Sequence, residues 1–116
     1  MVSNVNIPNT NGQIPNLPRT AVVETNAVFY QGTIQPVFAG EMKPTIRDLV
    51  MPHVVNHERI LEAALKPNFG LALDAFMDDP LVKGRISRED GVVLLREMIK
   101  NTLDILPEEW KKEVSK

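Results

Sequence analysis

The sequence contains no cysteine among its 116 residues. This absence excludes disulfide bonds, thiolate metal sites and cysteine nucleophiles within the chain. The sequence also lacks an apolar run of roughly 20 residues, the length that a membrane-spanning helix needs. Its polar N-terminus is unlike a secretory signal. These absences together predict a soluble, cytoplasmic protein with no membrane partner.

The chain also lacks an excess of charge of one sign. Its formal net charge is −2, and acidic and basic residues are interspersed without a basic stripe, so nucleic acid is not an expected partner. The Gly-rich patterns that cradle phosphates are absent, and so is the G-x-S-x-G nucleophile motif. Motifs alone therefore provide no catalytic residue in this chain.

What is present is the composition of one globular domain. Apolar residues make up 43% of the chain, and a chain of this size can bury roughly 65% of the surface that its unfolded form exposes. Residues 1–40 are rich in Pro, Asn, Val and Thr, whereas apolar residues recur at helical spacing from Glu41 onward. This change of texture predicts an α+β fold, with short antiparallel strands in the N-terminal third followed by three or four helices.

The N-terminal third contains three candidate strands. Residues 21–30, AVVETNAVFY, are dense in β-branched and aromatic residues, which favours a strand. Residues 32–40 form a second candidate, and the Gln-Gly pair between the two predicts a tight hairpin turn. Pro36 cannot donate to a sheet, so the second strand should be an edge or should be interrupted there. Residues 5–8 form a possible third strand.

Two helices are predicted in the middle of the chain. Residues 43–66 carry apolar side chains close to a period of 3.6 residues, which is typical of an amphipathic helix. Pro52 lies in the middle of this segment and should kink or split it. Asn68 is a good N-cap for a second, short helix over residues 69–79, which Pro80 should end.

A third helix is predicted to begin after Ser87, which forms a capping box with Asp90. Its apolar face is predicted to include Val92, Leu95, Ile99, Leu103 and Leu106. Pro107 should end that stripe and begin a final helical turn.

Two groups of side chains suggest chemistry. His53 and His57 are four residues apart, which would point both imidazoles the same way from a helix. No third metal ligand stands at a recognisable spacing and the H-E-x-x-H motif is absent, so structural or interface histidines are favoured over a metal site. Asp78 and Asp79 could form a pair of carboxylates, but solvated acids are common at a helix end before proline.

Four segments in succession resemble a known family. They are VNIPNTNGQIPNLPRTAVVETNAVF, QPVFAGEMK, HVVNHERILEAAL and ALDAFMDDPLV. This succession is similar to the C-terminal part of glycoside hydrolase family 4, and the similarity covers about residues 3–106. The segment VETNA, where many relatives read V-E-V-P-A, favours the α-galacturonidase-like branch.

The resemblance implies a fold and an activity. The fold is the C-terminal substrate domain of a lactate/malate dehydrogenase-like protein. Enzymes of this family bind NAD and a divalent metal, commonly manganese, and cleave a glycosidic bond by oxidising the sugar at C3 and eliminating across C2. Most glycosidases instead use two carboxylates, so Asp78 and Asp79 are not assigned those roles.

The sequence departs from the complete family pattern. The Rossmann half with its Gly-rich turn is absent, and so are the Cys and His that hold the metal; neither His53 nor His57 falls at that position. We therefore expect residues 1–116 to form one C-terminal domain, inactive alone, that binds neither NAD nor Mn²⁺ by itself. The expected partners are an N-terminal Rossmann half, a carbohydrate reached through the complete enzyme, and further copies in a homo-oligomer.

The Asn-rich segment 6–18 is predicted to be a held loop that enters the substrate domain. Asn6, Asn9 and Asn11 carry amides that can donate and accept hydrogen bonds toward sugar hydroxyls, and they are the candidate substrate-binding residues. The alternative is that they only satisfy the backbone of turns.

The alternative function is a free-standing helical module for interaction or dimerisation. An independent enzyme that uses the two histidines is a remote third. An open reading frame for a nucleotide-binding half upstream of Met1 would favour the glycosidase over the module.

Overall fold

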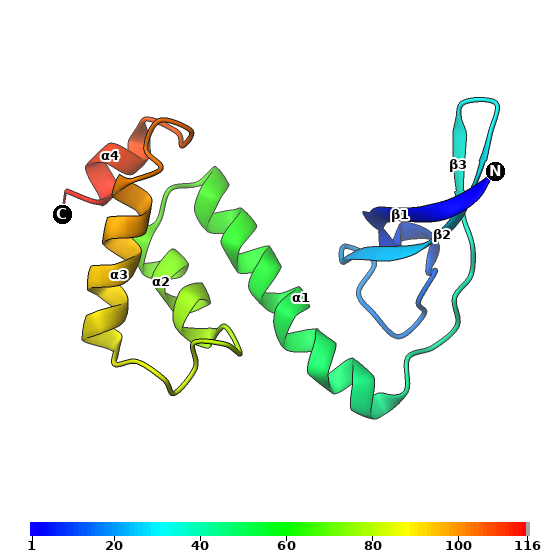
Figure 1. Cartoon of the computed structure of the whole chain (residues 1–116), viewed down its shortest axis with the longest axis horizontal. Helices are drawn as coiled ribbons and strands as arrows, with labels where there is room; N and C mark the ends of the chain where they lie inside the picture. Colours follow the sequence, from blue (N-terminus) through cyan, green and yellow to red (C-terminus); the bar gives the residue numbers. More distant parts are fainter. Residues whose placement is uncertain (116) are drawn as a thin grey trace. The chain divides into compact units, whose positions relative to one another are not determined.

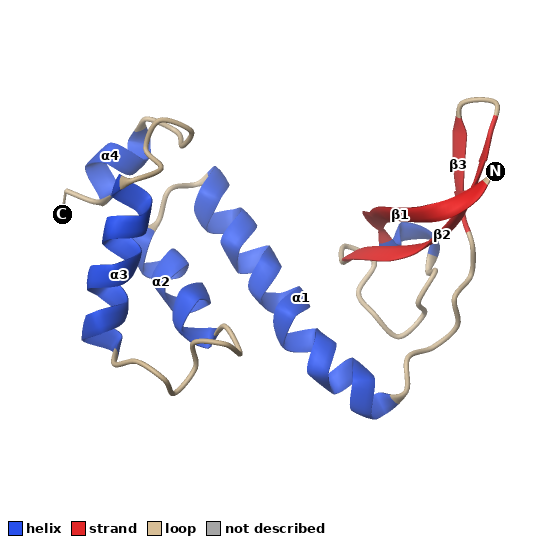
Figure 2. Cartoon of the chain, viewed as in Figure 1, coloured by secondary structure: helices blue, strands red, loops and turns tan. Residues whose placement is uncertain are grey.

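The structure is a computed structural model, and it describes residues 1–115. It contains three strands and then four α-helices, so the predicted α+β fold is confirmed (Figure 1, Figure 2). The elements are β1 (Val2–Pro8), the 3₁₀ turn η1 (Asn9–Asn11), β2 (Val22–Tyr30), β3 (Thr33–Pro36), α1 (Pro44–Leu65), α2 (Phe69–Asp78), α3 (Arg88–Lys100) and α4 (Glu109–Glu113). The chain divides into two compact units, the first up to Val54 and the second from Val55 onward.

The three strands form one antiparallel sheet in the order β1-β2-β3. Gln31 and Gly32 have φ angles of 46° and 75°, and two positive φ angles in succession are typical of the type I′ turns that match strand twist. The predicted hairpin is therefore confirmed. β3 ends at Pro36, as expected for a residue that has no backbone N–H to donate.

The first unit has its own apolar core under the sheet. Every second residue of β2 from Val23 to Ala27 is buried, which is the period of 2 that a half-buried strand requires. The core consists of Ile14, Leu17, Ala21 and Val23, with Met42, Val50, Met51 and Val54 packed against it.

Helix α1 contains 22 residues and runs without interruption through Pro52. The prediction that Pro52 would split this segment is wrong. A proline within a helix removes one backbone hydrogen bond, and here the hydrogen bonds and apolar contacts on either side keep one helix.

The second unit packs its helices around a separate core. That core consists of Leu73, Leu95, Ile99, Trp110 and Val114, with Phe69, Ala72, Phe76, Met77, Val92, Leu103 and Leu106 packed against it. Gly91 allows α3 to approach α2 closely, since a Cβ at that position would collide with Sδ of Met77.

The predicted helix caps are present. The backbone N–H of Leu71 donates to Oδ1 of Asn68 at 3.0 Å, and the N–H of Asp90 donates to Oγ of Ser87 at 3.0 Å. The C-terminal end of the third helix differs from the prediction, because α3 stops at Lys100. Leu103 and Leu106 follow in turns, yet they still pack against the core.

Among residues 1–115, no helix combines the length and the apolar character needed to cross a bilayer.

Candidate functional site

The Asn-rich loop between β1 and β2 is held together by Asn9. The Nδ2 amine of Asn9 donates to the carbonyl oxygens of Ile14, Leu17 and Pro18 at 2.9, 3.1 and 3.2 Å. Its Oδ1 accepts from the backbone N–H of Ile14 at 3.0 Å. Asn9 is fully buried, with 0% of its surface exposed, so one amide replaces water for four backbone groups.

Two further amides fasten the same loop at its edges. Nε2 of Gln13 donates to the carbonyl of Pro8 at 3.0 Å. Asn16 makes a reciprocal pair with Met42, since Nδ2 donates to the carbonyl at 2.8 Å and Oδ1 accepts from the N–H at 3.0 Å. The loop is therefore a built, rigid element that the side chains of its own residues hold in shape.

The three predicted substrate-binding residues lie in two environments. Asn6 on β1 and Asn11 in η1 are exposed. Within residues 1–115 neither side-chain amide has a hydrogen-bond partner, so both can meet a ligand. Asn9 is in the loop interior, and its bonds are those of the alternative in which it satisfies turn backbone. A substrate role for the three residues stays a prediction, with Asn6 and Asn11 as the accessible members.

Arg19 is a charged residue of this loop that the sequence did not bring to notice. Its Nη1 donates to the carbonyl of Thr10 at 3.1 Å, and its guanidinium lies against the α-carbon of Gly12. Gly12 has a φ of 70°, and a Cβ there would collide with the guanidinium. Among the residues that the structure describes, Arg19 makes no ion pair, so its remaining donors are available to an anionic group beside Asn11.

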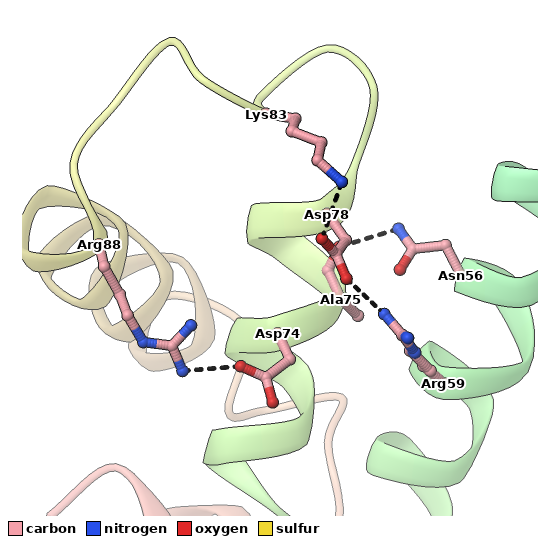
Figure 3. Close-up of polar contacts among 7 residues, drawn as sticks. All are labelled: Asn56, Arg59, Asp74, Ala75, Asp78, Lys83 and Arg88. Atoms are coloured by element: carbon pink, nitrogen blue, oxygen red, sulfur yellow. Dashed lines mark hydrogen bonds and ion pairs between the residues drawn. The ribbon is translucent and has the colours of Figure 1, made fainter.

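A second group of polar side chains connects helices of the second unit (Figure 3). Asp78 on α2 pairs with Nη1 of Arg59 on α1 at 2.6 Å and with Nζ of Lys83 at 3.4 Å. Asp74 pairs with Nη2 of Arg88 on α3 at 2.7 Å. Four of these side chains also line a hollow of about 310 Å³ between the three helices.

The charged group is suited to holding helices together rather than to proton transfer. The hydrogen bond from Arg59, and next that from Lys83, lowers the pKa of Asp78 below its ordinary value, so this carboxylate is ionised at neutral pH. Asp79 is used differently, since its Oδ1 accepts from the N–H of Leu81 at 2.8 Å. The two neighbouring acids therefore serve separate structural contacts.

His53 and His57 are exposed on α1. The prediction that His57 would lie on the buried apolar stripe is wrong, because the stripe turns another side of the helix inward, with Asn56 and Ala63 buried. In residues 1–115, no group of three His, Cys, Asp or Glu side chains is placed to hold a metal ion. Of the roles weighed for the two histidines, a buried structural one is excluded.

A large apolar groove opens in the second unit. Its volume is about 530 Å³, and its lining comes from α1, α2 and α3 and from the turns after α2 and α3. Four alanines contribute to the lining, together with larger apolar side chains and Asp79, its one charged residue among those described; the alanines are Ala63, Ala64, Ala72 and Ala75. A groove of this character is a binding surface for an apolar group.

The sequence matches the family 4 glycosyl hydrolase C-terminal domain over residues 1–82. The chain therefore belongs to this family. It is 52% identical to an α-galacturonidase of Lachnoclostridium phytofermentans over 95% of this chain and 24% of that protein. It is 46% identical to an α-galacturonidase of Thermoanaerobacterium saccharolyticum over 96% of this chain and 23% of that protein.

The fold is also similar to a solved enzyme structure. The 6-phospho-β-glucosidase of Thermotoga maritima, solved with manganese, NAD⁺ and glucose-6-phosphate, superposes with a TM-score of 0.77 and 26% identity over 90% of this chain and 26% of that chain. The present chain thus spans about a quarter of the length of the proteins that it matches.

Proposed function

We propose that this chain is the C-terminal part of an NAD- and manganese-dependent glycosidase that cleaves α-galacturonides, and that it is inactive alone. The single observation that carries the proposal is the identity of 52% to an α-galacturonidase over 95% of this chain. The similarity to a structure that contains manganese and NAD⁺ supports the cofactor requirement.

Both cofactors are assigned to the rest of the enzyme. Residues 1–115 do not assemble three metal-ligating side chains, and the sequence has no Gly-rich phosphate-binding turn. When bound there, the cofactors supply oxidation at C3 of the sugar and polarisation of the oxidised sugar, which permits elimination of the aglycone. No step of that chemistry is assigned to a residue of this chain.

The contribution of this chain is a rigid surface for the carbohydrate. The loop held by Asn9 presents the free amides of Asn6 and Asn11. Arg19 adds a positive charge beside them, and an arginine fork binds a carboxylate by two parallel hydrogen bonds. A galacturonide carries such a carboxylate at C6, so Arg19 favours an acidic sugar over a neutral one.

The test is a chimeric enzyme in which this chain replaces its matched quarter of the Lachnoclostridium phytofermentans α-galacturonidase. We expect the chimera to hydrolyse an aryl α-galacturonide only when NAD and Mn²⁺ are present, while the isolated chain releases no product. Arg19→Gln should raise KM for the galacturonide at least tenfold and leave KM for the matching galactoside unchanged. A folded chimera without activity would contradict the proposed function.

A further inference from the structure

The apolar groove of the second unit is an unfinished part of its core. Leu95, Ile99 and Trp110 belong to the buried core and also line the groove. At the same groove, Ile60 and Met98 are each 49% exposed and Leu81 is 74% exposed. Large apolar side chains gathered around a concave surface in this way are typical of an interaction site.

The polar atoms of the groove lining also lack partners. Asn56 and Trp110 are 4% and 3% exposed, and both line the groove. Nδ2 of Asn56 donates to the carbonyl of Ala75 at 2.8 Å, whereas Oδ1 of Asn56 and Nε1 of Trp110 have no hydrogen-bond partner. Unpaired buried polar atoms each destabilise a fold by about 1–3 kcal/mol, so the isolated chain leaves this region incomplete.

The shape of the groove argues against a second copy as its occupant. In a two-fold dimer the same patch of both copies meets itself, and two concave surfaces cannot fill one another. An occupant must be convex and must carry no charge, since the lining is apolar apart from Asp79, Asn56 and Thr102. The four alanines in the lining leave room for a helix to approach closely, because interaxial distance depends on the side chains at the contact.

The proteins that this chain matches are about four times as long as the matched part. The fold of this chain therefore occurs in a setting where three quarters of a much longer chain are available to cover it. We propose that the groove is the docking site for the remainder of the same glycosidase, and that the docked element is a helix with an uncharged, apolar face. This inference rests on the proposed function, in that it requires the rest of such an enzyme.

The experiment compares one substitution in two settings, the isolated chain and the chimera described above. Leu81→Glu places a carboxylate on a side chain that is 74% exposed in the isolated chain, so its melting temperature should change by less than about 1 °C. In the chimera the carboxylate would be trapped in an apolar contact, and the melting temperature should fall by at least about 3 °C. Met98→Glu is a second groove variant with the same expectation.

Leu65→Glu is the matched control, because Leu65 is 72% exposed and lies outside the groove lining. A fluorescent probe of apolar surface, anilinonaphthalene sulfonate, should bind the isolated chain and be excluded from the chimera. The proposal is overturned if the groove variants shift both settings alike, if the probe still binds the groove in the chimera, or if the chimera does not fold. It is equally overturned if the groove retains a small apolar molecule in the chimera, or if Leu81→Glu dissociates a dimer of the isolated chain.

The readouts keep this inference separate from the proposed function. A chimera that folds, excludes the probe and is sensitive to Leu81→Glu, but shows no hydrolysis, would refute the activity and leave the docking site in place. An active chimera that is indifferent to both groove variants would refute the docking site alone.

Discussion

The loop of the first unit and the groove of the second solve the same problem with opposite results. In the loop, polar groups removed from water find partners within a few residues, so that Asn9 alone serves four backbone groups. At the groove, apolar side chains remain exposed and two buried polar atoms stay unpaired. The loop is complete as it stands, whereas the groove depends on something outside this chain.

The comparison can be tested first at the core beside the groove. Trp110→Ala should reduce the free energy of unfolding by about 3–4 kcal/mol, the usual loss for a large buried aromatic side chain. Urea denaturation followed by circular dichroism at helical wavelengths measures the loss. Val93→Ala on the exposed side of α3 is the control, since Val93 is 67% exposed. A loss below 1 kcal/mol would show that the core is not formed around Trp110.

Asn9→Ala should lower the free energy of unfolding by about 3 kcal/mol. The substitution strands three carbonyls and one N–H in the loop interior, and each unpaired buried group is unfavourable by about 1–3 kcal/mol before relaxation and water entry reduce the sum. Amide exchange at Ile14 should accelerate in parallel.

Asn11→Ala is the matched control for Asn9→Ala, because the side chain of Asn11 is exposed in the same loop. We expect a change within about 0.5 kcal/mol. Equal effects of the two substitutions would contradict the assignment of Asn9 as the residue that holds the loop.

Gly12→Ala should destabilise the chain by about 1–2 kcal/mol, because Gly12 has a φ of 70° that side chains disfavour and the new Cβ would displace the guanidinium of Arg19. Gly84→Ala provides the comparison, since Gly84 has a φ of 75° and nothing within 4 Å of an added Cβ. The difference between the two variants in thermal melts measures the Arg19 contact. A smaller loss for Gly12→Ala than for Gly84→Ala would remove that contact from the account.

The smallest expected effect concerns pH and the exposed ion pairs. The pKa of Asp78 is lowered below 3.8 in the folded chain, first by Arg59 and then by Lys83. A lowered folded pKa means that its stabilising contribution is present above pH 3.8 and is lost as the pH falls through the folded value. Asp78→Asn should therefore lower the melting temperature slightly at pH 6, and the gap to the wild type should close below pH 3.

Several features were predictable from sequence because they depend on neighbours along the chain. The turn at Gln31-Gly32 and the caps at Asn68 and Ser87 each use backbone groups within three residues. The family resemblance was also visible, because its four segments are local strings of residues. Arg19 and Gly12 could have been paired only by knowing how the loop closes.

The sequence by itself determined that strands precede helices, where the helices begin, and that the Asn-rich segment is a held loop. Only the tertiary structure decided which asparagine is buried, that α1 continues through Pro52, and that α3 ends before Leu103. It alone also decided that a groove stays open beside Trp110. The reason is physical: caps and turns are set by hydrogen bonds over a few residues, whereas burial and concavity depend on which distant side chains meet. Periodicity identifies an apolar face without showing whether this chain itself covers it.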